Sequence, residues 1–348
     1  MKKKPMKTLI TGVGGRSIGA GILFSLRSLS PKYEIIATDA DPFSFGIYKA
    51  AEGYVVPKAD SPDYCKVLSG IANKHHIQAI LPGTIPEIET ISDNIDKIEA
   101  PLVMNLNTEL IKISKDKLDV FNHLKFLDIN TPETVLPSRV NELINSKGFP
   151  LIIKPRIGTG GSRNVTLIAN KEELDFIREE YETESISYVF QEVVGNGENE
   201  YTVGILNDIE GNLIDSIVIH RKLMGLSLKE QRMINGKIYS ISTGYSQGYI
   251  IKNEIISEYC EYVANLLGNI GPLNLQLRVI NDKIYIFELH PRFSGTTPIR
   301  ASVGFNEPDI LFRNFVLGEK FGRLNYQSNV AAIRAFEHII VPIDEMKM

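Results

Sequence analysis

The stretch GPLNLQLRVINDKIYIFELHPR, residues 271–292, consists of two apolar runs rich in strand-forming residues, separated by Asn281-Asp282. Asn and Asp tolerate the left-handed backbone that tight hairpin turns require. The stretch therefore predicts an antiparallel hairpin. Gln276 and Glu288 lie on opposite sides of the turn and can face each other across it.

The second strand of this hairpin ends in three polar side chains. Glu288, His290 and Arg292 occupy alternate positions, and alternate side chains of an extended chain share one face. Gln276 and Glu288 would suit Mg²⁺, which prefers oxygen ligands and shares phosphate oxygens. Zinc usually requires more His or Cys ligands than His290 supplies. A metal site, an acid–base pair, a surface ion cluster without a role and a structural histidine all stay open from these residues alone.

Outside the hairpin, the chain divides into regions with different patterns of helix and strand. Residues 1–105 alternate strand and helix patterns, which predicts a parallel α/β unit. Residues 106–185 begin with an amphipathic helix, for which we expect Ser114 as the N-cap and Asp116 in the first turn. Residues 186–348 contain longer strands and favour a more antiparallel α+β unit.

A glycine-rich turn follows the first predicted strand. TGVGGRSIGAG, residues 11–21, opens a helix, and Asp39 ends the next strand, which is the context of a dinucleotide-binding fingerprint. The third glycine of that fingerprint is replaced by Ser17. Nicotinamide binding by Gly12–Gly19 is therefore an alternative to a structural turn or an anion site.

A second glycine-rich segment is LIIKPRIGTGGSRNV, residues 151–165. Lys154 ends an apolar strand, and Gly158, Gly160 and Gly161 follow it. Glycines let backbone N–H groups approach phosphate oxygens. The order differs from a Walker P-loop, because the lysine comes first and a strand follows. A phosphate-binding loop and a surface hairpin both fit this segment.

A third polar group lies in VFQEVVGNGENEYTVGIL, residues 189–206. Gln191 and Glu192 end one strand, and Glu200 opens the next. A polar pair followed by an apolar stretch of backbone could bind the edge of a purine base. A carboxylate further along the chain could then bind the ribose hydroxyl groups. Ordinary hairpins often carry such residues as well.

Taken in order, these motifs resemble the ATP-grasp superfamily. The resemblance is closest to single synthetase units of the carbamoyl-phosphate synthase large chain and to related carboxylate–amine ligases, and it covers about residues 7–320. It rests on five segments, which are SKDKL (114–118), LIIKP with GTGGS (151–162), QEVVGNGENEYTV (191–203), NLQLRV (274–279) and FELHPRFSG (287–295). It implies a Rossmann-like N-terminal domain followed by a two-lobed ATP-grasp fold.

The resemblance also implies roles for individual residues. The ATP-binding set is Lys117, Lys154, Gly158, Thr159, Gly160, Gly161, Ser162, Gln191, Glu192, Val194 and Glu200. The catalytic set is Lys154, Glu288 and Arg292, and the set for Mg²⁺ or Mn²⁺ is Gln276, Glu288 and His290. His290 stands where the family usually has asparagine, so the number of metal ions stays open. A longer linker before Glu200 leaves Glu198 as an alternative to it.

The activity implied by the resemblance is ADP-forming ligation of a small carboxylic or amino acid to an amine or ammonia through an acyl phosphate. The expected substrate contacts are Thr84, Glu87, Arg221, Ser294, Thr296 and Arg300, and Lys222 is a further candidate at the rim. One alternative is a regulatory protein that binds ATP without catalysis. Another is an NAD(P)-dependent oxidoreductase that uses the first glycine cluster.

Composition limits the remaining classes of function. Of the 348 residues, 23% are charged and the net charge is −4, without a basic domain of the kind that binds nucleic acid. No run approaches the roughly 18 apolar residues of a membrane-spanning helix. Two widely spaced cysteines argue against a disulfide framework. We therefore expect a cytoplasmic protein with small-molecule partners, and a homodimer is the expected oligomeric state.

Overall fold

The first unit is built around a parallel sheet. A computed structural model describes residues 4–157, 164–181 and 187–347 of the chain. The sheet has the order β3-β2-β1-β4, from β1 (Met6–Thr11), β2 (Tyr33–Asp39), β3 (Glu52–Val55) and β4 (Ala79–Leu81). Its helices are α1 (Ile18–Arg27), α2 (Tyr64–His75) and α3 (Ile85–Asp93), with the 3₁₀ turns η1 (Phe45–Tyr48) and η2 (Ile95–Lys97). The parallel α/β prediction is confirmed.

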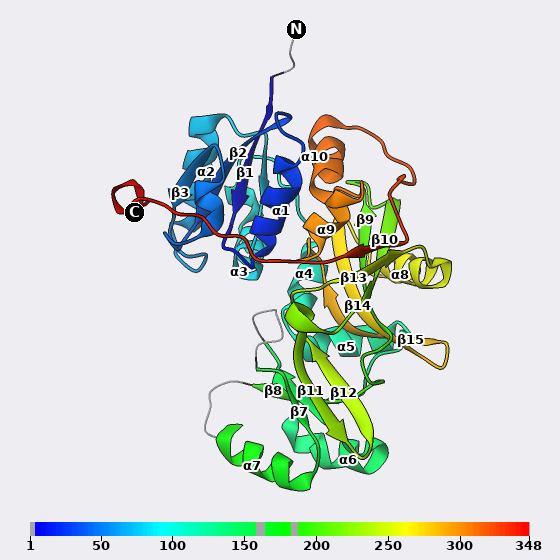
Figure 1. Cartoon of the computed structure of the whole chain (residues 1–348). Coiled ribbons are helices and arrows are strands. Elements are labelled where there is room, and N and C mark those ends of the chain that lie inside the picture. The colour runs from blue at the N-terminus through cyan, green and yellow to red at the C-terminus, as the bar shows by residue number, and fades with distance from the viewer. Residues whose placement is uncertain (1–3, 158–163, 182–186, 348) are drawn as a thin grey trace.

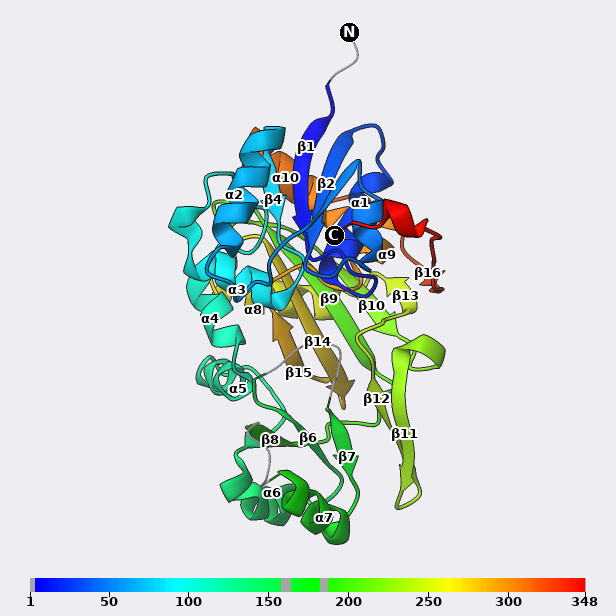
Figure 2. The same ribbon diagram turned by 90° about the vertical axis from the view of Figure 1, so that its left-hand side faces the viewer.

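Successive apolar side chains of these strands point to opposite faces of the sheet, and helices cover both faces. Ile10 and Leu81 pack in one core with α1, whereas their neighbours Leu9 and Ile80 pack in another with α2 and α3. Figure 2 shows α2 and α3 on one side of β1 and β2 and α1 on the other. The sheet is therefore covered on both faces, as parallel sheets usually are.

The largest sheet is antiparallel and has the order β15-β14-β9-β10-β13-β16. Its strands are β9 (Glu200–Asn207), β10 (Leu213–Arg221), β13 (Gly248–Ile251), β14 (Pro272–Ile280), β15 (Lys283–His290) and β16 (Val330–Ala332). The helices near it are α4 (Thr108–Ser114), α5 (Lys117–Phe126), α8 (Glu254–Leu266), α9 (Thr297–Ser302) and α10 (Glu307–Leu317). The α5 and α8 helices pack in a core on one face. On the other face, α1 of the first unit shares a core with α9, α10, β10 and β13.

A smaller lobe lies below this body in Figure 1. Its antiparallel sheet has the order β5-β8-β6-β7, from β5 (Thr134–Val135), β6 (Leu151–Pro155), β7 (Thr166–Ile168) and β8 (Tyr188–Glu192). The lobe also contains η3 (Pro137–Arg139), α6 (Val140–Lys147) and α7 (Lys171–Tyr181), and it has a hydrophobic core of its own. The mixed α/β and α+β fold class is confirmed. The boundaries expected at 105 and 185 stay predictions.

A hairpin from the larger sheet region reaches down beside this lobe (Figure 2). It consists of β11 (Leu228–Ile234) and β12 (Lys237–Ser242), after the 3₁₀ turn η4 (Gly225–Ser227). Arg232 Nη1 donates to Leu167 O of β7 at 2.9 Å, and Lys229 Nζ donates to Val165 O at 2.6 Å. The hairpin thus ties the smaller lobe to the rest of the molecule.

The helix expected to begin at Ser114 begins later. Ser114 ends α4, and Asp116 is the N-cap of α5. Asp116 has an extended backbone, and its carboxylate accepts a hydrogen bond from Leu118 N at 2.9 Å. The N-cap prediction was therefore wrong, because Asp116 satisfies the first N–H groups of a new helix. Lys117 becomes the first residue of α5.

The C-terminal segment returns to the first unit. β16 pairs with β13, and the chain then crosses the front of the α/β unit, as Figure 1 shows in red. After the last 3₁₀ turn η5 (Ile343–Glu345), Lys347 N donates to Tyr48 Oη at 3.1 Å.

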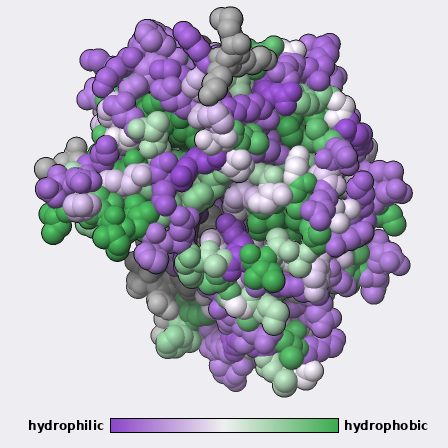
Figure 3. All heavy atoms as spheres, turned by 45° about the horizontal axis from the view of Figure 1, so that its top comes forward, coloured by the Kyte–Doolittle hydropathy of each residue, from purple (hydrophilic) through white to green (hydrophobic). Residues whose placement is uncertain are grey.

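Surface and cysteine features agree with the composition. Hydrophilic residues dominate the face shown in Figure 3, and hydrophobic residues form separate groups on it. Among the described residues, no helix is both long enough and apolar enough to span a membrane. Cys65 and Cys260 are buried and free.

Candidate functional site

A cavity of about 330 Å³ lies between the smaller lobe and the largest sheet, with residues of α3 and α5 along its edge. Most residues of the expected ATP-binding, catalytic and metal sets line it. They are Lys117, Lys154, Gln191, Glu192, Val194, Glu200, Glu288, His290 and Arg292. The expected loop residues Gly158, Thr159, Gly160, Gly161 and Ser162 lie outside the described residues. Segments far apart in sequence therefore meet at one cavity.

Lys154 is a buried cation at the inner wall of this cavity. Its Nζ donates to Gln191 Oε1 at 3.0 Å and lies 4.7 Å from the centre of the Phe121 ring. Burial lowers the pKa of Lys154 to about 7, the charge of Lys117 acts in the same direction, and Glu288 opposes them. Burial also lowers the pKa of Lys117. Lys117 and Lys154 are thus close enough for their positive charges to repel each other. An anion bound between them would reduce this repulsion.

Arg292 supplies a third cation. Burial lowers its pKa to about 10, against the opposing charge of Glu288. Its Nη1 donates to Phe293 O at 2.8 Å, while its buried Nε has no partner among the described residues. Lys117, Lys154 and Arg292 take no part in the salt bridges formed within the described part of the chain. Three cations without carboxylate partners around one cavity suit a polyanionic ligand such as a triphosphate.

Glu288 and His290 lie side by side at the end of β15. Glu288 Oε1 and His290 Nε2 are 2.8 Å apart. Burial alone would raise the pKa of Glu288, but the charges of His290, Arg292 and Lys154 bring it well below its usual range. Burial and Arg292 lower the pKa of His290, against the effect of Glu288. A carboxylate and a neutral imidazole are the forms that bind a divalent cation.

The third expected metal residue, Gln276, is placed differently. It faces Glu288 across the predicted hairpin, with Asn281 and Asp282 at positive φ in the turn. However, its Nε2 donates to Glu288 and its Oε1 accepts from Arg221 at 2.7 Å, and it does not line the cavity. No group of three or more His, Cys, Asp or Glu side chains suited to a metal ion occurs among the described residues. The protein ligands therefore fit a cation that takes its other ligands from phosphate and water.

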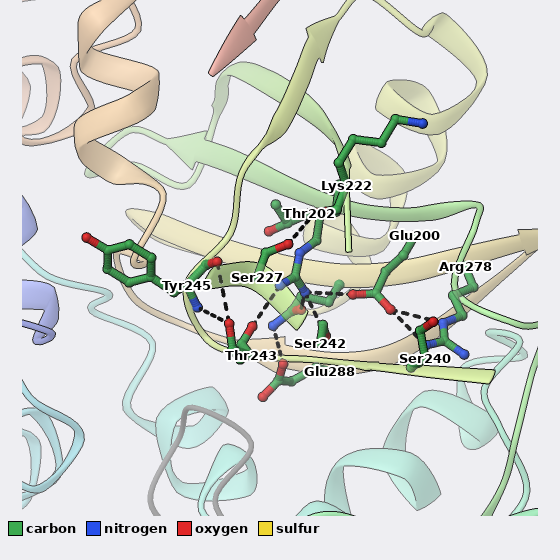
Figure 4. A network of polar contacts seen from close by, with 12 residues as sticks. Glu200, Thr202, Lys222, Ser227, Ser240, Ser242, Thr243, Tyr245, Arg278 and Glu288 are labelled. Atoms are coloured by element: carbon green, nitrogen blue, oxygen red, sulfur yellow. Dashed lines mark hydrogen bonds and ion pairs between the residues drawn. The ribbon is translucent and has the colours of Figure 1, made fainter. Parts of the chain in front are cut away.

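Glu200 is fully buried and pairs with two arginines, and Figure 4 shows it beside one of them, Arg278. Arg221 Nη1 lies 2.7 Å from its Oε1, and Arg278 Nη2 lies 2.9 Å from its Oε2. A carboxylate has about four acceptor sites, so Oε1 can still accept from a hydroxyl group. Glu200 lines the cavity, whereas the side chain of Glu198 is exposed. The geometry favours Glu200 over Glu198 as a ligand-binding carboxylate.

Sequence reasoning missed the apolar walls of the cavity, which include Phe121, Ile152, Ile241, Phe287 and Leu289. Ile152 could have been found, because it precedes Lys154 by two residues on the same face of β6. Phe287 could not, because a register shift in the β14–β15 ladder places it in a bulge beside Glu288. The N–H of Val194 donates to no other described residue.

The residues expected to contact the other substrate do not line this cavity. Thr84 caps α3 and donates to Glu87 Oε2 at 2.8 Å, and Tyr64 donates to Glu87 Oε1 at 2.9 Å. Burial raises the pKa of Glu87. The hydroxyl groups of Ser294 and Thr296 bond each other.

The two expected substrate arginines are both buried and paired. Arg300 Nη1 lies 2.7 Å from Glu307 Oε1, and its Nη2 donates to Asn274 Oδ1 at 2.7 Å. Arg221 is held by Glu200 and Gln276. Both arrangements favour structural roles. In Figure 4, the Lys222 side chain points away from the Glu200 network.

Arg334, which sequence reasoning did not single out, is a further cation near this end of the molecule. Its Nη1 donates to Gly295 O at 2.8 Å, and its guanidinium carbon lies 3.9 Å from the centre of the Tyr245 ring. The C-terminal segment thus reaches the chain that follows Arg292. Arg334 and Gly295 are 39 residues apart in the sequence, so their contact depends on the finished fold.

Comparisons with known proteins agree with the fold. A model described as an ATP-grasp domain matches residues 114–296, more than half of the chain, and a model of the PylC-like N-terminal domain matches residues 8–105. The carbamoyl phosphate synthase large chain of Lachnoclostridium phytofermentans is 25% identical over 366 residues, covering 98% of this chain and 32% of that protein. The chain spans only 22% to 33% of the length of the curated relatives that it matches.

Two solved structures show the same architecture. N5-carboxyaminoimidazole synthetase from Staphylococcus aureus, in complex with ADP, has a TM-score of 0.67 at 15% identity, with 93% of this chain and 81% of that chain covered. L-amino acid ligase from Bacillus licheniformis has a TM-score of 0.63 at 14% identity, with 90% and 75% covered. At these identities the likeness shows the fold alone.

Proposed function

Since the chain belongs to the ATP-grasp family, we propose that it is an ADP-forming ligase that joins a small carboxylic acid to an amine or ammonia. The observation that carries this proposal is the set of three cations, Lys117, Lys154 and Arg292, around the cavity that also contains Glu288. The proposal is supported by a solved structure of the same fold whose name, L-amino acid ligase, describes ligation of amino acids.

In this proposal ATP fills the cavity with its base against the apolar wall. Ile152 and Phe287 would contact adenine, and the N–H of Val194, which donates to no other described residue, would donate to its edge. Glu200 would accept from a ribose hydroxyl. The phosphates would then extend toward Lys117 and Lys154. By the resemblance described above, the segment 158–162 would cover the phosphates.

The reaction would begin with attack of a substrate carboxylate oxygen on the γ-phosphorus. The bond between that phosphorus and the β–γ bridging oxygen breaks, and ADP leaves. The amine then attacks the acyl carbon, phosphate leaves, and the amine loses a proton. Lys154 and Arg292 would stabilise charge on the transferred phosphoryl group. A divalent cation held by Glu288 and His290 would neutralise phosphate charge when bound.

The test is ADP formation with a panel of carboxylic acids and amino acids, alone and with amines or ammonia. We expect ADP release that depends on an acid and an amine together, with amide as the second product. Lys154→Ala should lower this rate by at least about a hundredfold, because it removes a buried transition-state contact. Unchanged turnover in Lys154→Ala would refute the assignment of that residue.

The two alternatives give different outcomes. Tight ATP binding without ADP release across the whole panel would favour a regulatory protein. NAD(H) binding by the first unit would favour an oxidoreductase. Against the latter, Ser17 accepts a hydrogen bond from Ala20 N as the N-cap of α1, where the fingerprint has its third glycine.

A further inference from the structure

Gln276 is fixed in one orientation by two neighbours of opposite hydrogen-bonding character. Arg221 Nη1 donates to Gln276 Oε1 at 2.7 Å, and Gln276 Nε2 donates to Glu288 Oε2. A guanidinium can only donate, and an ionised carboxylate can only accept. The amide oxygen therefore faces Arg221 and the amide nitrogen faces Glu288. The amide oxygen is thus turned away from Glu288, the expected ligand that lines the cavity.

The Arg221 side chain is itself locked, so this orientation is hard to reverse. Arg221 is 1% exposed, and its remaining bonds run to Glu200 Oε1, Ser242 Oγ and Thr243 O. Figure 4 shows Glu200, Ser242 and Thr243 together in this network. Turning the Gln276 amide would set its N–H groups against those of Arg221. Buried donors would then lack acceptors, which is costly in a site closed to water.

The positions of the other two expected ligands differ from that of Gln276. Glu288 and His290 line the cavity, and their Oε1 and Nε2 atoms are 2.8 Å apart. Gln276 lies behind Glu288 and does not line the cavity. Glu288 Oε2 receives the Gln276 hydrogen bond, which leaves Oε1 on the side of His290.

We propose that Gln276 is a positioning residue for Glu288, and that Glu288 and His290 alone supply the protein ligands of a divalent cation bound with the nucleotide. The inference rests on the proposed function, because it assumes nucleotide phosphates that complete the coordination. One carboxylate oxygen and one imidazole nitrogen then replace the three-residue set of Gln276, Glu288 and His290 that was expected from the sequence. Arg221 acts through Gln276 and makes no contact with the metal.

The experiment uses the full chain with Mn²⁺ and ADP as probes. Electron spin echo measurements detect the ¹⁴N coupling of an imidazole bound to Mn²⁺, and broadening of the Mn²⁺ spectrum by H₂¹⁷O counts the bound water molecules. The wild-type complex should show ¹⁴N coupling. His290→Ala should lose it and gain one water, because a ligand position opens.

Gln276→Met is the decisive variant. It should keep the ¹⁴N coupling and the wild-type number of waters, although its affinity for Mn²⁺ should fall about tenfold to a hundredfold, as expected when a partner of a ligand is removed. Gln247→Met serves as the matched control, because Gln247 donates to Met224 O at an exposed position.

Two results would overturn the inference while leaving the proposed function intact. One is a gain of one bound water in Gln276→Met, which would identify Gln276 as a ligand. The other is a wild-type Mn²⁺–ADP complex without ¹⁴N coupling. Failure of Mn²⁺ to bind with ADP at all would instead contradict the proposed function, and this inference with it.

Discussion

Lys154 combines burial with a position at the cavity wall, and its protonation should report on ligand binding. Burial and Lys117 lower its pKa to about 7 in the unliganded protein. Phosphate oxygens favour the ammonium form, so binding raises this pKa. We expect ADP binding to take up protons at about pH 8 and to lose this uptake below about pH 6, where Lys154 is already charged. Calorimetry in buffers with different ionisation enthalpies measures the uptake.

Lys154→Arg is the control for this prediction. Arginine stays charged throughout the pH range of interest, so it has no proton to take up. Lys117, whose pKa is also lowered, remains in the variant. Any proton uptake by Lys117 therefore appears in the variant as well and can be subtracted. Equal uptake in wild type and Lys154→Arg would show that another group takes up the proton.

Gly12 is fixed by both its conformation and its neighbours. It has a φ of +57°, and an added Cβ would lie 2.4 Å from Glu87 Oε2 and 2.4 Å from Thr84 Cγ2. We expect Gly12→Ala to lower the free energy of unfolding by about 1–3 kcal/mol, as overpacking of a filled site does. Urea unfolding measures this. Gly15→Ala is the matched control, because its Cβ would meet nothing within 4 Å, and a loss of the same size there would contradict the argument.

At the residue scale, the alternation of side chains along a strand predicted part of the site. The rest became visible only in the structure. Glu288, His290 and Arg292, which strand periodicity predicts to share one face, all line the cavity. The bulge at Phe287 breaks that periodicity and leaves no sequence mark. The orientation of the Gln276 amide depends on Arg221, 55 residues away. Whether these residues bind metal or phosphate stays a prediction.

At the scale of single elements, the start of α5 sets the position of Lys117. Asp116 caps the helix through Leu118 N and pairs with Arg156 Nε at 2.7 Å. We expect Asp116→Ala to destabilise the protein by about 1 kcal/mol through loss of the cap. It should also weaken ADP binding, because Lys117 loses its fixed position. Chemical unfolding and calorimetry with ADP measure the two effects.

Asp119→Ala is the control for the cap. Asp119 lies in the same first turn but is exposed, and its contact with Arg156 is longer, at 3.9 Å. It should leave both stability and ADP affinity nearly unchanged. If Asp119→Ala matched Asp116→Ala in both measurements, surface charge would explain the effect better than capping.

The β11–β12 hairpin should restrain the smaller lobe. Arg232 bonds Leu167 O of β7 at 2.9 Å and pairs with Glu173 of α7. We expect Arg232→Ala to speed hydrogen–deuterium exchange in β7, Thr166–Ile168, because the strand loses an external bond. Lys171→Ala breaks the exposed pair with Asp175 and should leave exchange in β7 unchanged. Equal acceleration in both variants would argue against restraint by the hairpin.

This hairpin was not expected from the sequence, although a signal was present. Asn235 and Gly236 adopt positive φ in its turn, and Asn-Gly between alternating residues is a strong hairpin pattern. Most other strands and helices were expected, because their apolar patterns are regular. The short strands β5 and β16 were not, since two or three residues carry no periodicity and pair only through the finished fold.

At the scale of the whole molecule, the first unit and the largest sheet behave as one body. Ile22 and Leu23 of α1 share a core with Phe312 of α10 and Ile217 of β10. The order of motifs predicted both units, but not this shared core, which depends on the shapes of surfaces distant in sequence. The same holds for Arg334, which reaches Gly295 only because the C-terminal segment folds back.

The pairing of β5 with β8 has a consequence for how such proteins can be recombined. Thr134 and Gln191 are partners in register, so the chain enters and leaves the smaller lobe at one place. The lobe is thus a continuous gene segment whose two ends meet in space, the condition under which insertions are tolerated. Two crossovers, near residues 131 and 194, would exchange it between homologues as a cassette. Such a chimera would inherit Lys154 and Gln191 from one parent and Glu288 and Arg292 from the other.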